Sequence, residues 1–262
     1  MILDVNAYLG HFAFRHLRHH TADALLSLMD PCGIDQAMVS SISAVTYRNP
    51  QPANEALADA VQPHRDRLIP LAVINPAYAG WRDDLKLCHE QFGMLGLRLY
   101  PKWHHYDLNG NAAGELIEAA TQRNMLLSIP LRVEDYRQRS WLVDVPDVPH
   151  AEIAEVVRAH PEARFVLVNG AGFSRSPLGR ADGDLPANYW IEISRLSALL
   201  AHEIGQLIHN LGPDRLLFGS GMPLKYPDPA LLKIEVLDAP QQVKQQILGA
   251  NAARLVKSNA NG

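Results

Sequence analysis

Eight short runs of apolar, β-branched or aromatic residues recur along the chain, and segments with helical periodicity separate them. This alternation is typical of parallel strands that are joined by right-handed helical crossovers. Eight strands exceed what a flavodoxin-like open sheet needs, so the pattern predicts a closed α/β barrel of the (β/α)8, or TIM, type. The expected strands are Ile2–Val5, Gln36–Ser41, Leu68–Ile74, Leu95–Tyr100, Met125–Ile129, Arg164–Val168, Tyr189–Ile193 and Arg215–Gly219.

The segments between these runs have recognisable helix ends. Thr21 is placed to cap a helix that runs towards Gly33, and Gly212–Pro213 ends the segment with the clearest apolar stripe. We expect one domain over residues 1–257 and a frayed tail over residues 258–262. The other expected helices are Asn54–Val61, Ala112–Arg123, Pro149–His160, Ser197–Leu211, Pro229–Leu237, Gln241–Leu248 and Asn251–Lys257.

Composition limits the classes of partner. A formal charge of −4 with no basic run gives no electrostatic reason to expect nucleic acid or an anionic membrane. No apolar stretch approaches the ~20 residues of a membrane span, and the start of the chain lacks a signal-peptide pattern. Cys32 and Cys88 are read as buried or incidental thiols. We therefore expect a cytoplasmic protein with a small-molecule substrate, and the fold class leaves a homo-oligomer open.

Several motifs fall at the expected strand ends. The first strand enters Asp4–Gly10, the fourth continues through Gly96–Pro101, and the eighth lies in Asp214–Ser220. Near the end of the chain comes Asn251-Ala252-Ala253-Arg254-Leu255, which follows a glycine. Together these motifs resemble the amidohydrolase-2 branch of the amidohydrolase superfamily, which has the metal-dependent-hydrolase fold. The resemblance covers most of the chain and implies a barrel with its active site at the carboxyl ends of the strands.

The positions at which this family usually carries metal ligands hold other residues. By the resemblance, the two histidines of the first strand map to Asn6 and Tyr8, and the histidine after the sixth strand maps to Asn169. The aspartate after the eighth strand maps to Gly221. Catalytic zinc needs about three nitrogen, sulfur or carboxylate ligands. The sequence therefore predicts that the usual metal site is absent and that no cofactor is required.

The same replacements suggest a polar pocket. Asn6, Tyr8 and Asn169 can hydrogen-bond a carbonyl or hydroxyl group of a substrate, or they can bond to one another and fill the space of the metal. In the fourth strand, alternation places Arg98 and Tyr100 on the interior face. Arg98 is then suited to bind a carboxylate or phosphate group, and its alternative partner is Asp4.

The loops after the fourth and fifth strands carry the candidates for proton transfer. His104 and Lys102 follow the fourth strand, and imidazole or a partly desolvated lysine can titrate near neutrality. After the fifth strand, Glu134 is a candidate base and Arg132 a candidate anion-binding residue. For each, the alternative is an ordinary exposed loop residue. The histidines after the first strand have irregular spacing, which favours a lid loop over a metal cluster; they are His11, His16, His19 and His20.

The leading hypothesis is a metal-independent, hydrolase-like enzyme that acts on a small polar or anionic substrate such as an ester, a lactone or a carboxylate. Its catalytic residues would be His104, Lys102 and Glu134, and its substrate-binding residues are Asn6, Tyr8, Arg98, Tyr100, Arg132 and Asn169. Gly221 weakens the case for hydrolysis, because it cannot act as the carboxylate base. A metal-free lyase or isomerase, such as a decarboxylase, and a catalytically silent binding barrel are the alternatives.

Overall fold

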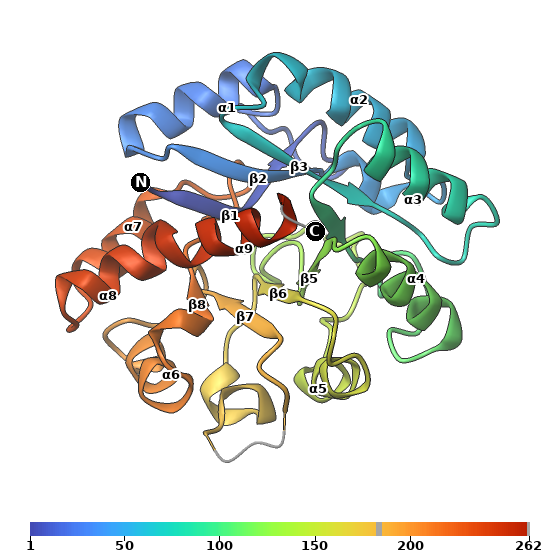
Figure 1. Ribbon diagram of the computed structural model, residues 1–262. Helices are drawn as coiled ribbons and strands as arrows, with labels where there is room; N and C mark the ends of the chain where they lie inside the picture. The colour runs from blue at the N-terminus through green and yellow to red at the C-terminus, as the bar shows by residue number, and fades with distance from the viewer. Residues whose placement is uncertain (182–184, 261–262) are drawn as a thin grey trace.

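The strands form one eight-stranded parallel sheet in the order β1 to β8, and helices surround it (Figure 1). The computed structural model describes residues 1–181 and 185–260. The strands are β1 Leu3–Leu9, β2 Gln36–Ser41, β3 Leu68–Val73, β4 Gly96–Arg98, β5 Leu126–Pro130, β6 Phe165–Val168, β7 Tyr189–Glu192 and β8 Leu216–Leu217. The helices are α1 Ala22–Met29, α2 Gln51–Val61, α3 Trp81–Glu90, α4 Asn111–Gln122, α5 His150–Ala159, α6 Glu203–Leu211, α7 Asp228–Glu235, α8 Gln241–Gln245 and α9 Asn251–Ala260.

The barrel closes between β1 and the segment that follows β8. The Val5 amide donates to the Phe218 carbonyl at 3.0 Å, and the Tyr8 amide donates to the Met222 carbonyl at 2.9 Å. Between them, the Gly221 amide donates to the Asn6 carbonyl at 2.8 Å. The predicted TIM barrel is therefore confirmed, and its closure places the residues after β8 directly beside the end of β1.

Most predicted elements are present, but several helices differ from the prediction, and two of these differences are large. The helix expected from Ser197 begins only at Glu203, because His202 adopts a left-handed backbone with φ of 49°. Leu200 is therefore 97% exposed rather than part of the apolar stripe. The sequence reading also missed α3, whose buried face consists of only three residues. Thr21 caps α1 as predicted, accepting from the Ala24 amide at 3.3 Å.

Strand β1 contains an irregularity that the simple alternation of side chains did not predict. The register with β2 shifts between Asp4 and Ala7. Before the shift, Val5 packs in the barrel interior, and after it Ala7 packs with the outer layer of apolar side chains. Leu97 and Leu99 of the fourth strand lie in that outer layer, as expected. The irregularity matters because it turns polar groups of β1 towards the interior.

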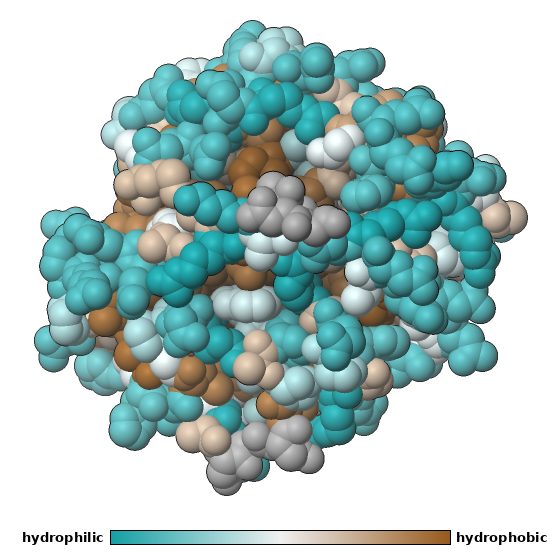
Figure 2. Space-filling model, viewed as in Figure 1, coloured by the Kyte–Doolittle hydropathy of each residue, from teal (hydrophilic) through white to brown (hydrophobic). Residues whose placement is uncertain are grey.

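The C-terminal helix α9 closes the amino-terminal end of the barrel. Its Ala252 and Leu255 pack with interior side chains of the strands, and Figure 1 shows α9 crossing this end. The helix continues to Ala260 rather than ending at Lys257, and Ser258 accepts a hydrogen bond from Asn124 at 3.1 Å. The last two residues of the predicted tail lie outside the described residues. Figure 2 shows this end as largely hydrophilic, with apolar colour in recesses.

With the amino-terminal end closed, the opposite end of the barrel is left for a site. Within residues 1–181 and 185–260, no helix has the length and apolar character needed to cross a membrane.

Candidate functional site

A cavity of about 710 Å³ opens among the loops that follow β5, β7 and β8. This volume lies in the range typical of small-molecule sites. The described residues that line it include five basic side chains and one carboxylate. The basic side chains are Arg132, Arg137, Arg195, Lys225 and Lys233, and the carboxylate is Asp135. The composition of the wall therefore favours an anionic ligand.

Beneath the cavity, three side chains predicted for substrate binding form one hydrogen-bonded group. The Asn6 amide nitrogen donates to Asn169 Oδ1 at 3.1 Å, and Asn169 Nδ2 donates to the Tyr8 hydroxyl at 2.9 Å. All three side chains are fully or almost fully buried. The structure brings these residues together as predicted, but they bond to one another, which was the alternative reading of their role.

Glu192, at the end of β7, joins this group from below the cavity. Its Oε2 accepts from Asn6 Nδ2 at 3.2 Å and from the Asn169 backbone amide at 2.9 Å. The same oxygen accepts from the Ser194 hydroxyl at 3.1 Å, and Oε1 accepts from the Ser194 amide. The carboxylate is fully buried, so these donors are what stabilise its charge.

Lys225 lies directly above this network. Its Nζ donates to Ser194 Oγ at 3.2 Å, so a continuous path of hydrogen bonds runs from the amine through Ser194 to Glu192. A Cβ placed on Gly221 would lie 3.5 Å from this Nζ and 3.4 Å from Asn169 Oδ1. The lysine amine therefore stands over the position at which the family resemblance puts the metal-binding aspartate.

The backbone conformation at residue 221 favours a glycine at this position. Its φ is +80°, a region that glycine adopts without the strain that other residues suffer. A side chain here would also point into the space beside the Lys225 amine. Gly221 thus makes the turn after β8 and leaves room for the ammonium group.

The environment of Lys225 weakens its hold on a proton. Burial, with the positive charge of Arg195 next in importance, lowers its pKa from 10.5 to about 8. Glu192 and Asp135 oppose this shift, and Lys233 adds to it. Burial likewise lowers the pKa of Lys233, whose Nζ donates to the Ser194 carbonyl. The two lysines therefore converge on Ser194 from the cavity side.

Asp135 organises the arginines of the wall. It pairs with Arg195 at 3.1 Å and with Arg137 at 2.9 Å. Hydrogen bonding from Arg137 holds the pKa of Asp135 well below its usual range. Arg195 is mostly buried, and this burial lowers its pKa. These ion pairs fix the guanidinium groups of Arg137 and Arg195 at the rim of the cavity. Among residues 1–181 and 185–260, no carboxylate directly contacts the amine of Lys225 or Lys233.

Arg98 points into the barrel as predicted, but it contacts protein and not the cavity. Its guanidinium donates to the Val5 and Ala7 carbonyls at 3.2 and 3.1 Å. It also lies 4.7 Å from the centre of the Tyr8 ring. The expected alternative partner, Asp4, is replaced by the backbone of β1. Tyr100 is buried as well, and burial raises its pKa, so it stays neutral.

Asp4, at the start of the irregularity in β1, is also a buried carboxylate. Its Oδ1 accepts from the Asn6 amide at 2.8 Å and from the Ser220 amide at 3.1 Å. Burial raises its pKa from 3.8 to about 7, and the nearby charge of Glu192 contributes. In the folded protein Asp4 therefore keeps its proton over a pH range in which the unfolded chain has released it.

Asp4→Asn is expected to stabilise the protein increasingly as the pH rises. The pKa of Asp4 is higher in the folded protein, at about 7, than in the unfolded chain, at 3.8. The free energy of unfolding of the wild type therefore falls as the pH rises between these two pKa values. Asparagine stays neutral and can keep both backbone hydrogen bonds through Oδ1. Urea unfolding should show the variant gaining on the order of 1–3 kcal/mol between about pH 5 and about pH 8. A constant difference between the two would contradict the raised pKa.

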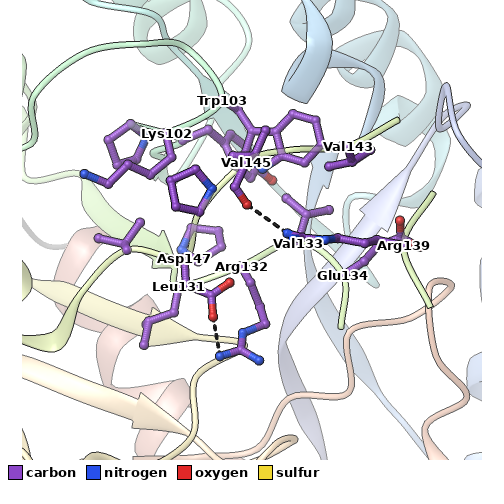
Figure 3. Close-up of a pocket in the computed structure, with 15 residues that line it drawn as sticks. Lys102, Trp103, Leu131, Arg132, Val133, Glu134, Arg139, Val143, Val145 and Asp147 are labelled. Carbon is purple, nitrogen blue, oxygen red and sulfur yellow. Dashed lines mark hydrogen bonds and ion pairs between the residues drawn. The ribbon is translucent and has the colours of Figure 1, made fainter. Parts of the chain in front are cut away.

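Three predicted residues, Lys102, Arg132 and Glu134, meet at a second, smaller cavity between the loops after β4 and β5 (Figure 3). Its volume is about 20 Å³, which is room for about one water molecule and not for a substrate. Figure 3 shows Lys102 directed away from Arg132 and Glu134, and its Nζ pairs with Glu152 at 2.7 Å. These three residues therefore do not form an open catalytic site at this cavity.

The charged groups around this small cavity hold the two loops together. Arg132 pairs with Asp147 at 2.5 Å and also borders the large cavity. The Glu134 side chain is only 6% exposed and pairs with Arg15 at 3.3 Å, and partial burial raises its pKa. Of the predicted residues, Arg132 is therefore the one with access to both cavities.

His104 turns away from both cavities. Its Nε2 lies 3.0 Å from the Ala44 carbonyl, and its ring packs against Tyr100 at 5.9 Å between centroids. Burial lowers its pKa, so the neutral form is favoured. This geometry gives His104 a packing role between two loops, and neither cavity includes it in its wall.

The histidines after β1 do not form a metal cluster. His11 and His20 stack with centroids 4.3 Å apart, and His16 lies 6.3 Å from His20. Among residues 1–181 and 185–260, no group of three or more histidine, cysteine, aspartate or glutamate side chains is arranged to hold a metal ion.

The residues at the strand ends do not fit the divalent metal that the family resemblance implies. The donors there are two amides, a phenol and one carboxylate, and the amides and phenol already bond to one another. Glu192 accepts from four protein donors, so its oxygens are engaged. The Lys225 ammonium lies over the remaining position, and a second cation beside it would be repelled.

Sequence reasoning missed the residues that dominate the large cavity. Glu192 is the last residue of β7, and Ser194 and Arg195 come within three residues of it. A charged residue inside that apolar strand was a readable signal. Lys225 and Lys233 come after β8, and nothing local in the sequence shows that they turn back over the barrel.

The comparisons agree with this architecture. The model of the amidohydrolase family matches residues 13–257, and the chain therefore belongs to this family. Among curated proteins, none matches significantly.

Three solved structures illustrate the similarity. A dihydroxybenzoic acid decarboxylase from Polaromonas with bound manganese has a TM-score of 0.74 at 16% identity, over 98% of this chain and 97% of that one. A 4-oxalomesaconate hydratase from Rhodopseudomonas palustris has a TM-score of 0.70 at 16% identity, over 100% and 97%. A probable 2-pyrone-4,6-dicarboxylic acid hydrolase from Acinetobacter baumannii has a TM-score of 0.67 at 14% identity, over 98% and 99%. At these identities the likeness establishes the fold.

Proposed function

We propose that this protein is a metal-independent lyase that acts on a small carboxylate, with decarboxylation as the reaction type. The observation that carries the proposal is the pair of lysines at the floor of the large cavity. Lys225 and Lys233 both direct their amines at Ser194, and neither has a carboxylate in direct contact among residues 1–181 and 185–260. Buried positive charge without a counter-ion is costly, so an anionic ligand would complete the site.

The arginines of the wall support the same ligand class. Arg195 and Arg132 have fixed positions because each is paired with an aspartate, so a planar carboxylate can be bound with little loss of side-chain entropy. In the family the metal supplies positive charge at the strand ends. Here the side chains of the loops after β5, β7 and β8 supply it.

The related structures favour a lyase over the hydrolysis that led the sequence-based reading. Their names include decarboxylases and a hydratase as well as a hydrolase. The 2,6-dihydroxybenzoate decarboxylase was solved with its carboxylate substrate. Gly221 argues in the same direction, because hydrolysis would lack the carboxylate base that the family resemblance puts at this position.

A silent binding barrel is the second candidate. The hydrogen-bonded group of Asn6, Tyr8 and Asn169 favours it, because these side chains bond to one another and are buried beneath the cavity. Such a protein would bind the same anions as the lyase and convert none of them.

A ligand screen followed by turnover assays separates the two functions. Hydroxybenzoates and small oxo acids would be tested for thermal stabilisation of the protein, and each hit would be followed by NMR for loss of substrate and release of carbon dioxide. The lyase proposal expects conversion that survives chelator treatment. Stabilisation without conversion supports the binding barrel, and a complete lack of carboxylate binding would overturn the proposal.

Gly221→Asp and Gly221→Ala form a matched pair that isolates charge from backbone strain. Both place a side chain at φ of +80°, so each should lower the free energy of unfolding by about 1–2 kcal/mol. Only the aspartate can pair with the nearby Lys225 amine and compete with a carboxylate ligand. We therefore expect calorimetry to show weaker carboxylate binding for the aspartate variant than for the alanine variant. Equal affinities would mean that Lys225 does not contact the ligand.

A further inference from the structure

We propose that Lys225 is a catalytic nucleophile whose amine forms an imine with the carbonyl group of a 3-oxo acid held in the large cavity. This inference rests on the proposed function, because it names the reacting residue and the substrate class of the same cavity. The geometry has three parts: an amine that borders the cavity, a hydrogen-bonded path to a base, and cations placed to hold a carboxylate.

The first part is the position of the amine. Lys225 lies among the cavity-lining residues, and its Nζ is above Gly221 at the carboxyl end of β8, near the mouth of the barrel. Among the described residues, its Nζ makes one hydrogen bond, to Ser194 at 3.2 Å, and no ion pair. An ammonium group has three donor hydrogens, so imine formation would not break a contact with a carboxylate of these residues. Lys102, the lysine favoured by the sequence, is instead tied to Glu152 at 2.7 Å.

The second part is the means of removing a proton from the ammonium. Ser194 Oγ accepts from Lys225 and donates to Glu192 Oε2 at 3.1 Å. The Asn6 side chain and the Asn169 backbone amide hold that carboxylate in place. A nucleophile, a relay and an oriented base within hydrogen-bond reach are the arrangement that activates side-chain nucleophiles. The lowered pKa of about 8 adds to this, since a substantial fraction of the amine is neutral near neutral pH.

The third part is the binding of the acid. Arg195 and Lys233 line the same cavity as Lys225, and the Lys233 Nζ donates to the backbone carbonyl of Ser194, the residue whose hydroxyl accepts from Lys225. A carboxylate placed against these two cations would bring a carbonyl carbon, two bonds away in a 3-oxo acid, within reach of the amine.

Overall the reaction consumes one proton from the solvent, and the water that is released on forming the iminium ion is taken up again in its hydrolysis. The neutral amine attacks the carbonyl carbon, and the resulting carbinolamine takes a proton at its hydroxyl group, through the path from Glu192 and Ser194, and loses water to give an iminium ion. The bond to the carboxyl carbon then breaks, its electron pair moves towards the iminium nitrogen to form an enamine, and carbon dioxide leaves. The enamine carbon takes a proton, and water hydrolyses the regenerated iminium ion to release the ketone and the lysine amine.

Reductive trapping tests the proposal directly. The wild-type protein would be incubated with acetoacetate and sodium borohydride, and the modified lysine would be located by peptide mass spectrometry. We expect a single adduct on Lys225, formed about 10- to 100-fold faster than on the exposed Lys86, since the lowered pKa enlarges the neutral fraction. Benzoate, which has the carboxylate but lacks the oxo group, should slow the labelling.

Two variants control this experiment. Lys225→Arg keeps the charge but cannot form an imine, so its adduct should be lost, while Lys86→Arg, at an exposed position outside the cavity, should still be labelled at Lys225. If Lys225→Arg fails to fold, the pH dependence of the labelling rate of the wild type tests the proposal instead. This rate should rise around pH 8, the lowered pKa of Lys225, and not near 10.5, the pKa of an ordinary lysine. An absent adduct, or one spread evenly over lysines, overturns this inference. If carboxylates still bind and react in that case, the proposed function stands.

Discussion

Lys225→Met is expected to have two effects of opposite sign. The free protein should become more stable by about 1–3 kcal/mol near pH 7, because burial lowers the pKa of this lysine to about 8 and its charged form is therefore unfavourable in the fold. Carboxylate affinity should fall about 10- to 100-fold, which corresponds to the loss of one hydrogen bond to a charged group. Urea unfolding and calorimetric titration measure the two effects on the same samples.

The pH dependence gives this prediction a second check. A lysine with a lowered folded pKa destabilises the fold while it is charged, and this cost disappears as the pH rises from about 8 towards the unfolded value of 10.5. The stability gain of the variant should therefore shrink over that range. The charged groups that set the shift are Arg195, Glu192, Lys233 and Asp135. Lys86→Met, on the exposed face of α3, is the control and should change neither the stability nor the carboxylate affinity. If Lys225→Met behaved like this control, Lys225 would not be the buried, ligand-binding amine described above.

Arg98→Met is expected to lower the free energy of unfolding by about 3–5 kcal/mol. The guanidinium donates to two carbonyls of β1 across the barrel, and each charge-assisted bond contributes about 1.5–3 kcal/mol. Methionine has a similar length, so little of the loss would come from an empty cavity. Both carbonyls would be left buried without their donor. Equilibrium unfolding in urea measures the change.

Arg98→Lys separates charge from geometry in the same position. One ammonium cannot reproduce the forked contact with Val5 and Ala7, so we expect a loss between those of the wild type and Arg98→Met. A methionine variant that lost less than about 1 kcal/mol would show that the β1 carbonyls find other donors.

The fold could be predicted because its signal is local and repeated. Each strand is a short apolar run, and helix ends such as Thr21 follow from capping chemistry within a few residues. Errors came where local patterns were weak or overridden. The stripe through Leu199 and Leu200 looked helical, but the left-handed His202 prevents the helix from starting before Glu203.

The site could be predicted only in part, because its contacts join distant segments. The family resemblance alone singled out Asn6, Tyr8 and Asn169, and the structure places their side chains in one hydrogen-bonded group. The sequence did not show which cation would face the cavity. Lys225 reaches the cavity through the turn at Gly221 and bonds to Ser194, which lies at the end of another strand. Lys102 and His104 have side chains suited to the same chemistry. However, Lys102 is paired with the carboxylate of Glu152, and the His104 ring bonds to the backbone carbonyl of Ala44.

We propose that side-chain cations take the place of the family's metal at the carboxyl end of the barrel. The most direct test of this claim is a calorimetric titration with a carboxylate ligand from the screen, using protein stripped by a chelator and the same protein supplied with manganese or zinc. We expect the same affinity in both samples and a loss of affinity in Lys225→Met. Binding that appears only when the metal is restored, and that does not depend on Lys225, would contradict the claim.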